Sequence, residues 1–157
     1  MNMFRTEEYA ADASGQRWHA NNLSVAYALL RITLGINIAI HGISRILAGP
    51  ASFAAALSKQ FASAPLPHFA VLGFGHVLPW LETLIGLSIL FGAFTRAALV
   101  AGAGLIIVLT FGSTLHQDWD SASIQLIYAT VYFILIALRS YNEISIDGLM
   151  LHGSSKT

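Results

Sequence analysis

The sequence contains no cysteine, and this absence removes several kinds of chemistry at once. Without thiolates there is no cysteine nucleophile, no cysteine-ligated metal or iron–sulfur cluster, no disulfide and no covalently attached haem. Charged residues are also scarce, at 10% of 157 residues, whereas soluble domains carry about 25%. Because so few charges could not solvate a globular surface, the composition predicts a membrane protein.

The chain also has no net charge. Eight acidic and eight basic residues cancel, so no global field favours nucleic acid as a partner. Residues 1–22 carry charges but no apolar core, so we expect no cleavable signal peptide and interpret them as a polar cytoplasmic segment. Hydrophobic residues, by contrast, make up 55% of the chain, and the mean hydropathy is +0.65.

Four apolar segments account for most of these hydrophobic residues. They lie at about 23–47, 69–93, 96–116 and 122–140, each close to the ~20 residues that a helix needs to cross a bilayer. The connection 48–68 has proline breaks around a mildly amphipathic piece, Phe53 to Phe61, which predicts a short helix at the membrane interface. The other two connections are tight, which favours antiparallel neighbours.

The predicted fold class is therefore all-α, an integral membrane four-helix up-down bundle over 23–149 with a tail at 150–157. Lysine and arginine place six positive charges on the side of the termini and two on the other side. By the positive-inside rule both termini are expected in the cytoplasm. The six are Arg5, Arg17, Arg31, Arg96, Arg139 and Lys156, and the two are Arg45 and Lys59.

Each predicted span carries one stripe of small and polar residues when it is plotted at 100° per residue. The stripes comprise Arg31, Gly35, Ile38, Gly42 and Arg45, with His41 at the margin; Gly75, Pro79, Glu82 and Gly86; Gly102, Ser113, His116 and Gln117; and Gln125, Tyr128, Ala129, Tyr132 and Arg139. Two interpretations stay open: close packing of helices through small residues, and an interior that holds a ligand.

Glu82 is the only acid within a predicted span. A charge at mid-depth costs about 2.5–3.5 kcal/mol on insertion scales, so Glu82 is expected to face a partner, and Arg31 or Arg139 is the natural counter-ion. That pairing leaves one arginine over, which suggests a bound anion, a lipid headgroup or a carbonyl-bearing ligand. Glu82 is either a structural ion-pair member or a proton carrier, and His41 is a second candidate for proton exchange.

The histidines raise the question of haem b, which needs two imidazoles at similar depth on facing helices. His41 and His76 satisfy the depth condition, but His76 lies about 120° around its helix from Glu82, so haem b is disfavoured. No two histidines stand four residues apart on a span, and no metal site is predicted.

The remaining inward polar residues predict where a ligand would bind. His116 and Gln117, together with His41 and Arg45, indicate a polar mouth that faces outward. Tyr128 and Tyr132 lie one turn apart on the polar stripe, so both are candidate ligand contacts. The candidate ligand-binding residues are therefore Arg31, Arg45, His116, Gln117, Tyr128, Tyr132 and Arg139.

Three stretches resemble the DoxX family of small bacterial membrane proteins. "LLRITLGINIAIHGISRIL" looks like the first span of that family, "LETLIGLSILFGAFTR" like its second, and "RSYNEISIDGLM" like its ending after the fourth. The likeness covers about residues 27–149, in order and with compatible spacing. Arg45 stands where a lysine is usual, which keeps the charge but changes the hydrogen-bonding geometry. The motif positions are Arg31, His41, Gly42, Arg45, Glu82, Gly86, Thr95 and Arg96.

The resemblance implies a four-helix subunit of the bacterial inner membrane. Relatives resemble the membrane subunit of thiosulfate:quinone oxidoreductase, others are associated with oxidative-stress complexes, and distant animal proteins act as receptor-assembly chaperones. The first hypothesis is therefore a quinone-interacting subunit of a respiratory or redox complex, which is at most part of an oxidoreductase. The alternative is a non-catalytic assembly subunit that packs against a larger membrane partner. A proton or solute pathway ranks last, because four short spans would form one only as an oligomer.

Overall fold

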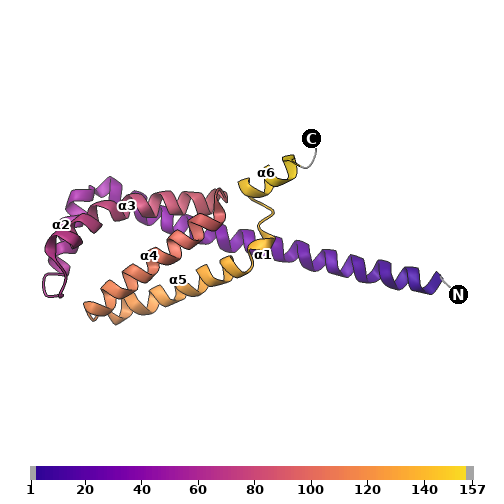
Figure 1. Cartoon of the computed structure of the whole chain (residues 1–157), viewed down its shortest axis with the longest axis horizontal. Coiled ribbons are helices and arrows are strands. Elements are labelled where there is room, and N and C mark those ends of the chain that lie inside the picture. The colour runs from indigo at the N-terminus through magenta and orange to yellow at the C-terminus, as the bar shows by residue number, and fades with distance from the viewer. Residues whose placement is uncertain (1–2, 155–157) are drawn as a thin grey trace.

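The computed structural model describes the backbone of residues 3–154 and the side chains of residues 21–150. Within this part the chain is helical and has no β-strand. Its elements are α1 (Met3–Ala48), α2 (Pro50–Gln60), α3 (His68–Phe91), α4 (Thr95–Leu115), α5 (Trp119–Ala137), the 3-10 helix η1 (Arg139–Tyr141) and α6 (Ile146–Ser154) (Figure 1).

Four stretches in the described residues are long and apolar enough to cross a membrane: Asn21–Ala48, His68–Phe91, Thr95–Leu115 and Trp119–Ala137. The predicted all-α four-helix bundle is therefore confirmed, and so is the short helix between the first two spans, which is α2. The structure adds three features: α1 begins at Met3, and η1 and α6 follow the last span. The polar character predicted for residues 1–22 and the tail at 150–157 fall mainly on side chains outside the described residues.

The bundle has two ends with different structures. The α2 end holds α2, the ends of α1 and α4, and the starts of α3 and α5, whereas the terminal end holds the α3–α4 turn, η1 and α6. The helices α4 and α5 run side by side and diverge from α1 and α3 toward the α2 end (Figure 1). The hydrophobic core lies mainly in the terminal half and consists of Tyr27, Leu34, Ile38, Ile89, Ala98, Leu99, Ile106, Tyr132 and Leu135.

Helices α1 and α3 cross closely because glycines line their contact. A Cβ added at Gly35 would lie 2.5 Å from the backbone nitrogen of Leu90, and one added at Gly86 would lie 2.6 Å from the Cα of Ala39. Both distances are shorter than side-chain carbons tolerate, so only glycine permits this approach. Small residues of this kind let helices in membranes pack through their backbones.

The contact between Gly86 and Ala39 generates the first prediction. The variant Gly86→Ala should lose about 1–3 kcal/mol of stability, because the new methyl group has to push the two helices apart. The matched control is Gly104→Ala, since a Cβ at Gly104 meets nothing within 4 Å. The measurement is the melting temperature of each purified variant in detergent. Equal melting temperatures for the two variants would contradict the close crossing.

Candidate functional site

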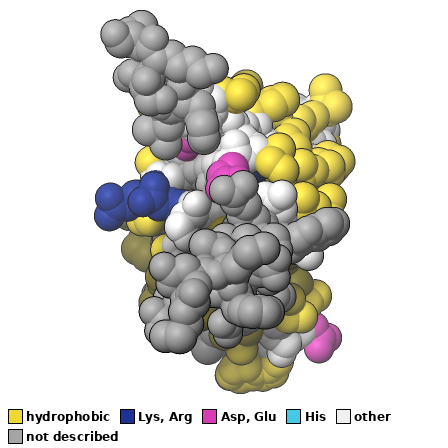
Figure 2. Space-filling view, turned by 90° about the vertical axis from the view of Figure 1, so that its right-hand side faces the viewer, with side chains coloured by type: hydrophobic (Ala, Val, Ile, Leu, Met, Phe, Trp, Pro, Cys, Tyr) yellow, Lys and Arg dark blue, Asp and Glu magenta, His cyan; other side chains and the backbone are white. Residues whose placement is uncertain are grey.

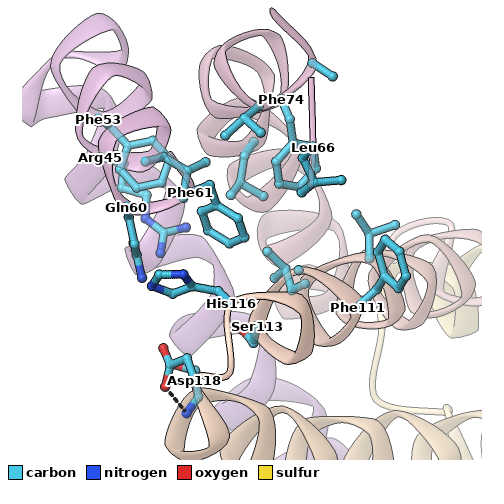
Figure 3. A pocket seen from close by; sticks show the side chains of 18 residues that line it. Arg45, Phe53, Gln60, Phe61, Leu66, Phe74, Phe111, Ser113, His116 and Asp118 are labelled. Atoms are coloured by element: carbon cyan, nitrogen blue, oxygen red, sulfur yellow. Dashed lines mark hydrogen bonds between the residues drawn. The ribbon is translucent and has the colours of Figure 1, made fainter. Parts of the chain in front are cut away.

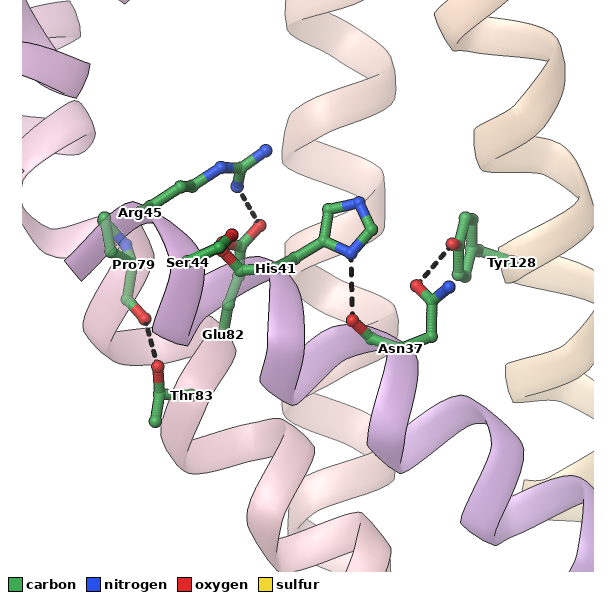
Figure 4. A network of polar contacts seen from close by, with 8 residues as sticks. All are labelled: Asn37, His41, Ser44, Arg45, Pro79, Glu82, Thr83 and Tyr128. Carbon is green, nitrogen blue, oxygen red and sulfur yellow. Dashed lines mark hydrogen bonds and ion pairs between the residues drawn. The ribbon is translucent and has the colours of Figure 1, made fainter. Parts of the chain in front are cut away.

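Glu82, the acid at mid-span in α3, forms an ion pair with Arg45. The guanidinium of Arg45, on α1, donates a hydrogen bond to Oε1 of Glu82, on α3 (Figure 4). Glu82 is buried, and Arg45 is partly exposed. Among the described residues, Glu82 Oε2 is a buried atom without a hydrogen-bond partner. The pair therefore joins a buried carboxylate to an arginine that is open on one side.

The predicted pairing of Glu82 with Arg31 or Arg139 is wrong, and the register of α1 against α3 explains why. Gly35 faces Leu90 and Gly42 faces Thr83, so residues of α1 farther toward the α2 end face earlier residues of α3. In this antiparallel register Arg45 lies level with the turn of α3 that contains Glu82. Arg31 lies four turns away, at about 1.5 Å per residue, beside the end of α3.

Arg31 instead binds backbone carbonyls at the terminal end. It is 2% exposed, and its guanidinium donates to the carbonyl oxygens of Ile89 at 2.5 Å, Leu90 at 2.7 Å and Ile144 at 2.8 Å. The last carbonyls of a helix have no partner within the helix and carry the negative end of its dipole, so they are suitable acceptors for a buried cation. Arg31 is thus compensated by carbonyls of α3 and of the segment before α6 and needs no bound anion. Arg139 is exposed in η1.

Asp147 completes the terminal end by capping α4 from another segment of the chain. Its carboxylate accepts hydrogen bonds from the backbone N–H of Phe94 at 2.9 Å and of Thr95 at 2.7 Å. Asn142 donates to the hydroxyl of Thr95 at 2.9 Å. Partial burial of Asp147 opposes ionisation, but the hydrogen bonds from Thr95 and Phe94 outweigh it and hold the pKa of Asp147 below its ordinary value. Figure 2 looks onto this end, with charged and polar groups beside hydrophobic flanks.

A cavity of about 450 Å³ lies at the α2 end, between α2, α3, α4 and the start of α5 (Figure 3). Its walls are mainly apolar and include Phe53, Leu57, Phe61, Leu66, Val71, Phe74, Leu78, Leu109 and Phe111. Its polar lining consists of Arg45, Gln60, Ser113, His116, Asp118 and Ser121. Figure 3 shows Arg45, Gln60 and His116 gathered on one side with the rings of Phe53 and Phe61 beside them, whereas Phe74 and Phe111 lie away from this group.

Aromatic contacts hold the two main polar groups of the cavity in place. The guanidinium carbon of Arg45 lies 4.6 Å from the centre of the Phe53 ring, a cation–π contact. The rings of Phe61 and His116 have centres 5.3 Å apart at 31°. Beyond them, Asp118 caps α5 and accepts from Ser121, and these hydrogen bonds hold the pKa of the Asp118 carboxyl below its ordinary value.

Of the residues predicted to bind a ligand, the structure brings Arg45 and His116 together at this cavity. Tyr132 is buried against Gly102, and Tyr128 donates to Oδ1 of Asn37 at 2.6 Å. Gln117 is exposed at the α4–α5 turn, with φ +58°. The other predicted ligand contacts do not line the cavity, namely Tyr128, Tyr132, Gln117, Arg31 and Arg139.

The histidines of the first two spans bond to their own helices. Nδ1 of His41 donates to the carbonyl of Asn37 at 2.9 Å, and Nδ1 of His76 donates to the carbonyl of Leu72 at 2.9 Å. Both rings are exposed, which leaves His41 beside the ion pair but outside the cavity (Figure 4). In the described residues no three His, Asp or Glu side chains are grouped to hold a metal ion.

Sequence reasoning missed the contribution of α2 to the site. Phe53, Leu57 and Phe61 stand four residues apart and all line the cavity, with Gln60 beside them. That spacing predicts an amphipathic helix at the membrane interface, and the structure shows that its apolar face lines the cavity. The sequence feature that could have indicated the packing of α2 against α3 is Gly75. A Cβ added there would lie 2.8 Å from the Cα of Ala54, so only glycine permits the two helices to pack this closely.

The arrangement favours a ligand that accepts hydrogen bonds and has an apolar ring or chain. Within the described residues Glu82 is the only hydrogen-bond partner of the Arg45 guanidinium, so further N–H groups of Arg45 are available to a carbonyl or an oxyanion. His116 supplies a second polar group and the phenylalanines supply apolar contact. The cavity volume falls within the ~300–1,000 Å³ typical of small-molecule sites.

The ion pair generates the second prediction. Arg45→Gln leaves Glu82 buried without its counter-ion and should cost about 1–3 kcal/mol, which is less than for a fully buried pair because Arg45 is partly exposed. Adding Glu82→Gln should recover most of this loss, because two amides can hydrogen-bond without a net charge. The melting temperatures of both single variants and the double variant in detergent measure the coupling. Arg139→Gln is the control, and strictly additive losses would contradict the pairing.

The cap on α4 generates the third prediction, which concerns pH. Because the folded pKa of Asp147 lies below its ordinary value of 3.8, its stabilisation is complete above about pH 4 and is lost as the pH falls through the folded value. At pH 7 Asp147→Ala should cost about 1 kcal/mol, and the difference from wild type should shrink below about pH 3. Melting temperatures between pH 7 and pH 3 test this, with exposed Glu143→Ala as control. A constant difference would exclude the charged cap.

The chain matches no family model, no curated protein and no solved structure.

Proposed function

We propose that the protein is a quinone-binding subunit of a membrane redox complex, with the quinone head in the cavity at the α2 end. The observation that carries this proposal is the cavity, where the polar groups of Arg45 and His116 lie against phenylalanine rings and the rest of the lining is mainly apolar. A quinone has the matching chemistry: a flat apolar ring that fits between aromatic side chains and two carbonyls that accept hydrogen bonds. The resemblance to the DoxX family supports the same class of ligand.

The residues present fit this group in three respects. Arg45 is held by Glu82 and Phe53, so its guanidinium is oriented before a ligand arrives. His116 is held against Phe61 and faces the same side of the cavity. Glu82 Oε2 has no hydrogen-bond partner in the described residues, so the carboxylate has an oxygen free to hold a proton. In this proposal Arg45 and His116 bind and orient the quinone head, and Glu82 holds a proton.

A bound quinone would supply two-electron, two-proton chemistry that the side chains lack. The electron carrier would belong to another subunit, because this chain offers no cysteine ligands for a cluster. In this proposal the protein is a multi-pass subunit of a bacterial inner membrane, with both termini in the cytoplasm and the α2 end outside. The excess of lysine and arginine near the termini supports that orientation.

The alternative function, a non-catalytic assembly subunit, is favoured by the exposed side of α5. Only 17% of the most apolar 18-residue stretch of α5 is buried within the structure. In a bilayer lipid covers such a surface, but a helix of a larger partner would cover it equally well. An assembly subunit needs no ligand in the cavity, so ligand binding separates the two functions.

The fourth prediction is the test of quinone binding. His116→Leu should weaken binding of a short-chain ubiquinone about tenfold, which corresponds to the loss of about one hydrogen bond. His76→Leu is the matched control, because His76 is exposed on α3 and does not line the cavity. Calorimetry on the protein in nanodiscs measures the affinity, and organic extraction of the natively purified protein measures bound quinone.

Two results would contradict the proposal. One is wild-type protein that binds no quinone, whether added or co-purified. The other is binding that the two histidine variants weaken equally, which would place the ligand outside the cavity. A large membrane partner that co-purifies with a ligand-free subunit would favour the assembly function.

A further inference from the structure

We infer that water and protons reach the Arg45–Glu82 ion pair from the α2 end alone, through the cavity, and that the terminal half of the bundle is a seal. This inference goes beyond the binding of any particular ligand. It follows from a difference between the two halves of the molecule. The half at the α2 end is hollow and partly polar, whereas the other half contains a layer of fully buried apolar side chains between the ion pair and the polar groups of the terminal end.

The open half begins at the polar mouth of the cavity. The cavity is lined by Gln60 at the end of α2, His116 at the end of α4 and Asp118 before α5, where these helices end or begin. Waters inside proteins need two to four polar partners, and this side of the cavity supplies them. Arg45 is deeper and also lines the cavity, so the polar lining continues to the ion pair (Figure 3).

The sealed half lies between the ion pair and the terminal end. Ile89, Leu99 and Leu135 are each 0% exposed, and they come from three different helices. Ile89 follows Glu82 by two turns of α3, or about 10 Å along the helix. The ring of Tyr132 lies so close to Gly102 that a Cβ there would be 2.6 Å from its Cε1. An apolar layer this tightly packed leaves no room for water.

Glu82 lies at the boundary between the two halves. Its free Oε2 is buried and without a partner in the described residues, which is the position where a proton or a water would bind. The titratable or charged groups near enough to act on Glu82 are Arg45 and His41 of α1 and Tyr132 of α5. Arg45 alone among these also lines the cavity, so a ligand or ion that binds Arg45 from the cavity competes with Glu82 for it.

The sidedness has one consequence that rests on the proposed function. If the cavity holds a quinone, proton exchange by Glu82 takes place with the compartment at the α2 end, which the positive-inside rule assigns to the outside. The bundle itself then gives the redox step a direction with respect to the membrane. No pathway through the terminal half is needed.

The chain provides its own test, because it has no cysteine and every introduced thiol is unique. Ser113→Cys lines the cavity and Ala98→Cys lies in the apolar core, and the native residues are similarly buried, at 9% and 7% exposed. The exposed residues Ser63, in the α2–α3 loop, and Ser140, in η1, mark the two sides when replaced by cysteine. A small membrane-impermeant methanethiosulfonate is added to sealed vesicles of either orientation.

The fifth prediction is that the reagent labels Ser113→Cys only from the side from which it labels Ser63→Cys. It should also label Ser113→Cys at least about tenfold faster than Ala98→Cys, because only a water-accessible thiolate reacts. Ser121→Cys, also in the cavity, should behave like Ser113→Cys and covers the case in which that variant misfolds. In the charge-neutral double variant Arg45→Cys/Glu82→Gln, the thiol should be labelled from the same side only.

Two results would overturn the inference. One is labelling of Arg45→Cys from the side that labels Ser140→Cys, and the other is an equal labelling rate for Ser113→Cys and Ala98→Cys. These outcomes are separate from the failure of the proposed function. Labelling requires no quinone, so an accessible cavity that binds no quinone refutes only the proposed function. An inaccessible cavity with normal quinone binding refutes only the one-sided access.

Discussion

The close crossing of α1 and α3 determines where Arg31, Arg45 and Glu82 are placed. Glycines at positions 35, 42 and 86 bring the two backbones together, and the contacts of these glycines fix one register. In that register Arg45 meets Glu82, while Arg31 meets the carbonyls that end α3. A shift of one turn would separate both arginines from their partners, and it would leave Arg31 and Glu82 as buried charges without compensation. Backbone packing and electrostatics therefore support the same arrangement.

The two arginines of α1 show how one residue type serves two purposes. Arg31 uses its donors on three backbone carbonyls and is almost fully buried, so it has become part of the framework that joins α3 to the C-terminal segment. Arg45 bonds to one carboxylate oxygen and otherwise faces a cavity. Charge alone does not separate these roles. The separation comes from the surroundings of each guanidinium, which are three backbone carbonyls in a buried site for Arg31 and one carboxylate beside a cavity for Arg45.

The fold could be predicted because length and hydropathy alone define four spans, and the prolines of the 48–68 connection bracket α2. The charge pairing could not, because helical periodicity says which face a residue occupies but not its depth against a neighbouring helix. The register depends on which glycine meets which backbone, and this is a property of two helices together. The sequence predicts the polar mouth with Arg45 and His116, but not the apolar walls that α2 supplies, because the apolar face of α2 looks the same in sequence whether it covers lipid or a hollow between helices.

Arginine at position 45 has a physical rationale that a lysine would lack. A guanidinium offers five N–H donors in a plane, so one edge can bond to Glu82 while another faces the cavity, and its face can stack on Phe53. An ammonium group is a point charge that would be drawn to the carboxylate, with weaker stacking and less reach into the cavity. Arginine thus keeps the acid compensated and still presents donors to a ligand. Under the proposed function, Arg45 can therefore stabilise the bundle through Glu82 and also bind the ligand, because the two roles use different atoms of the same side chain.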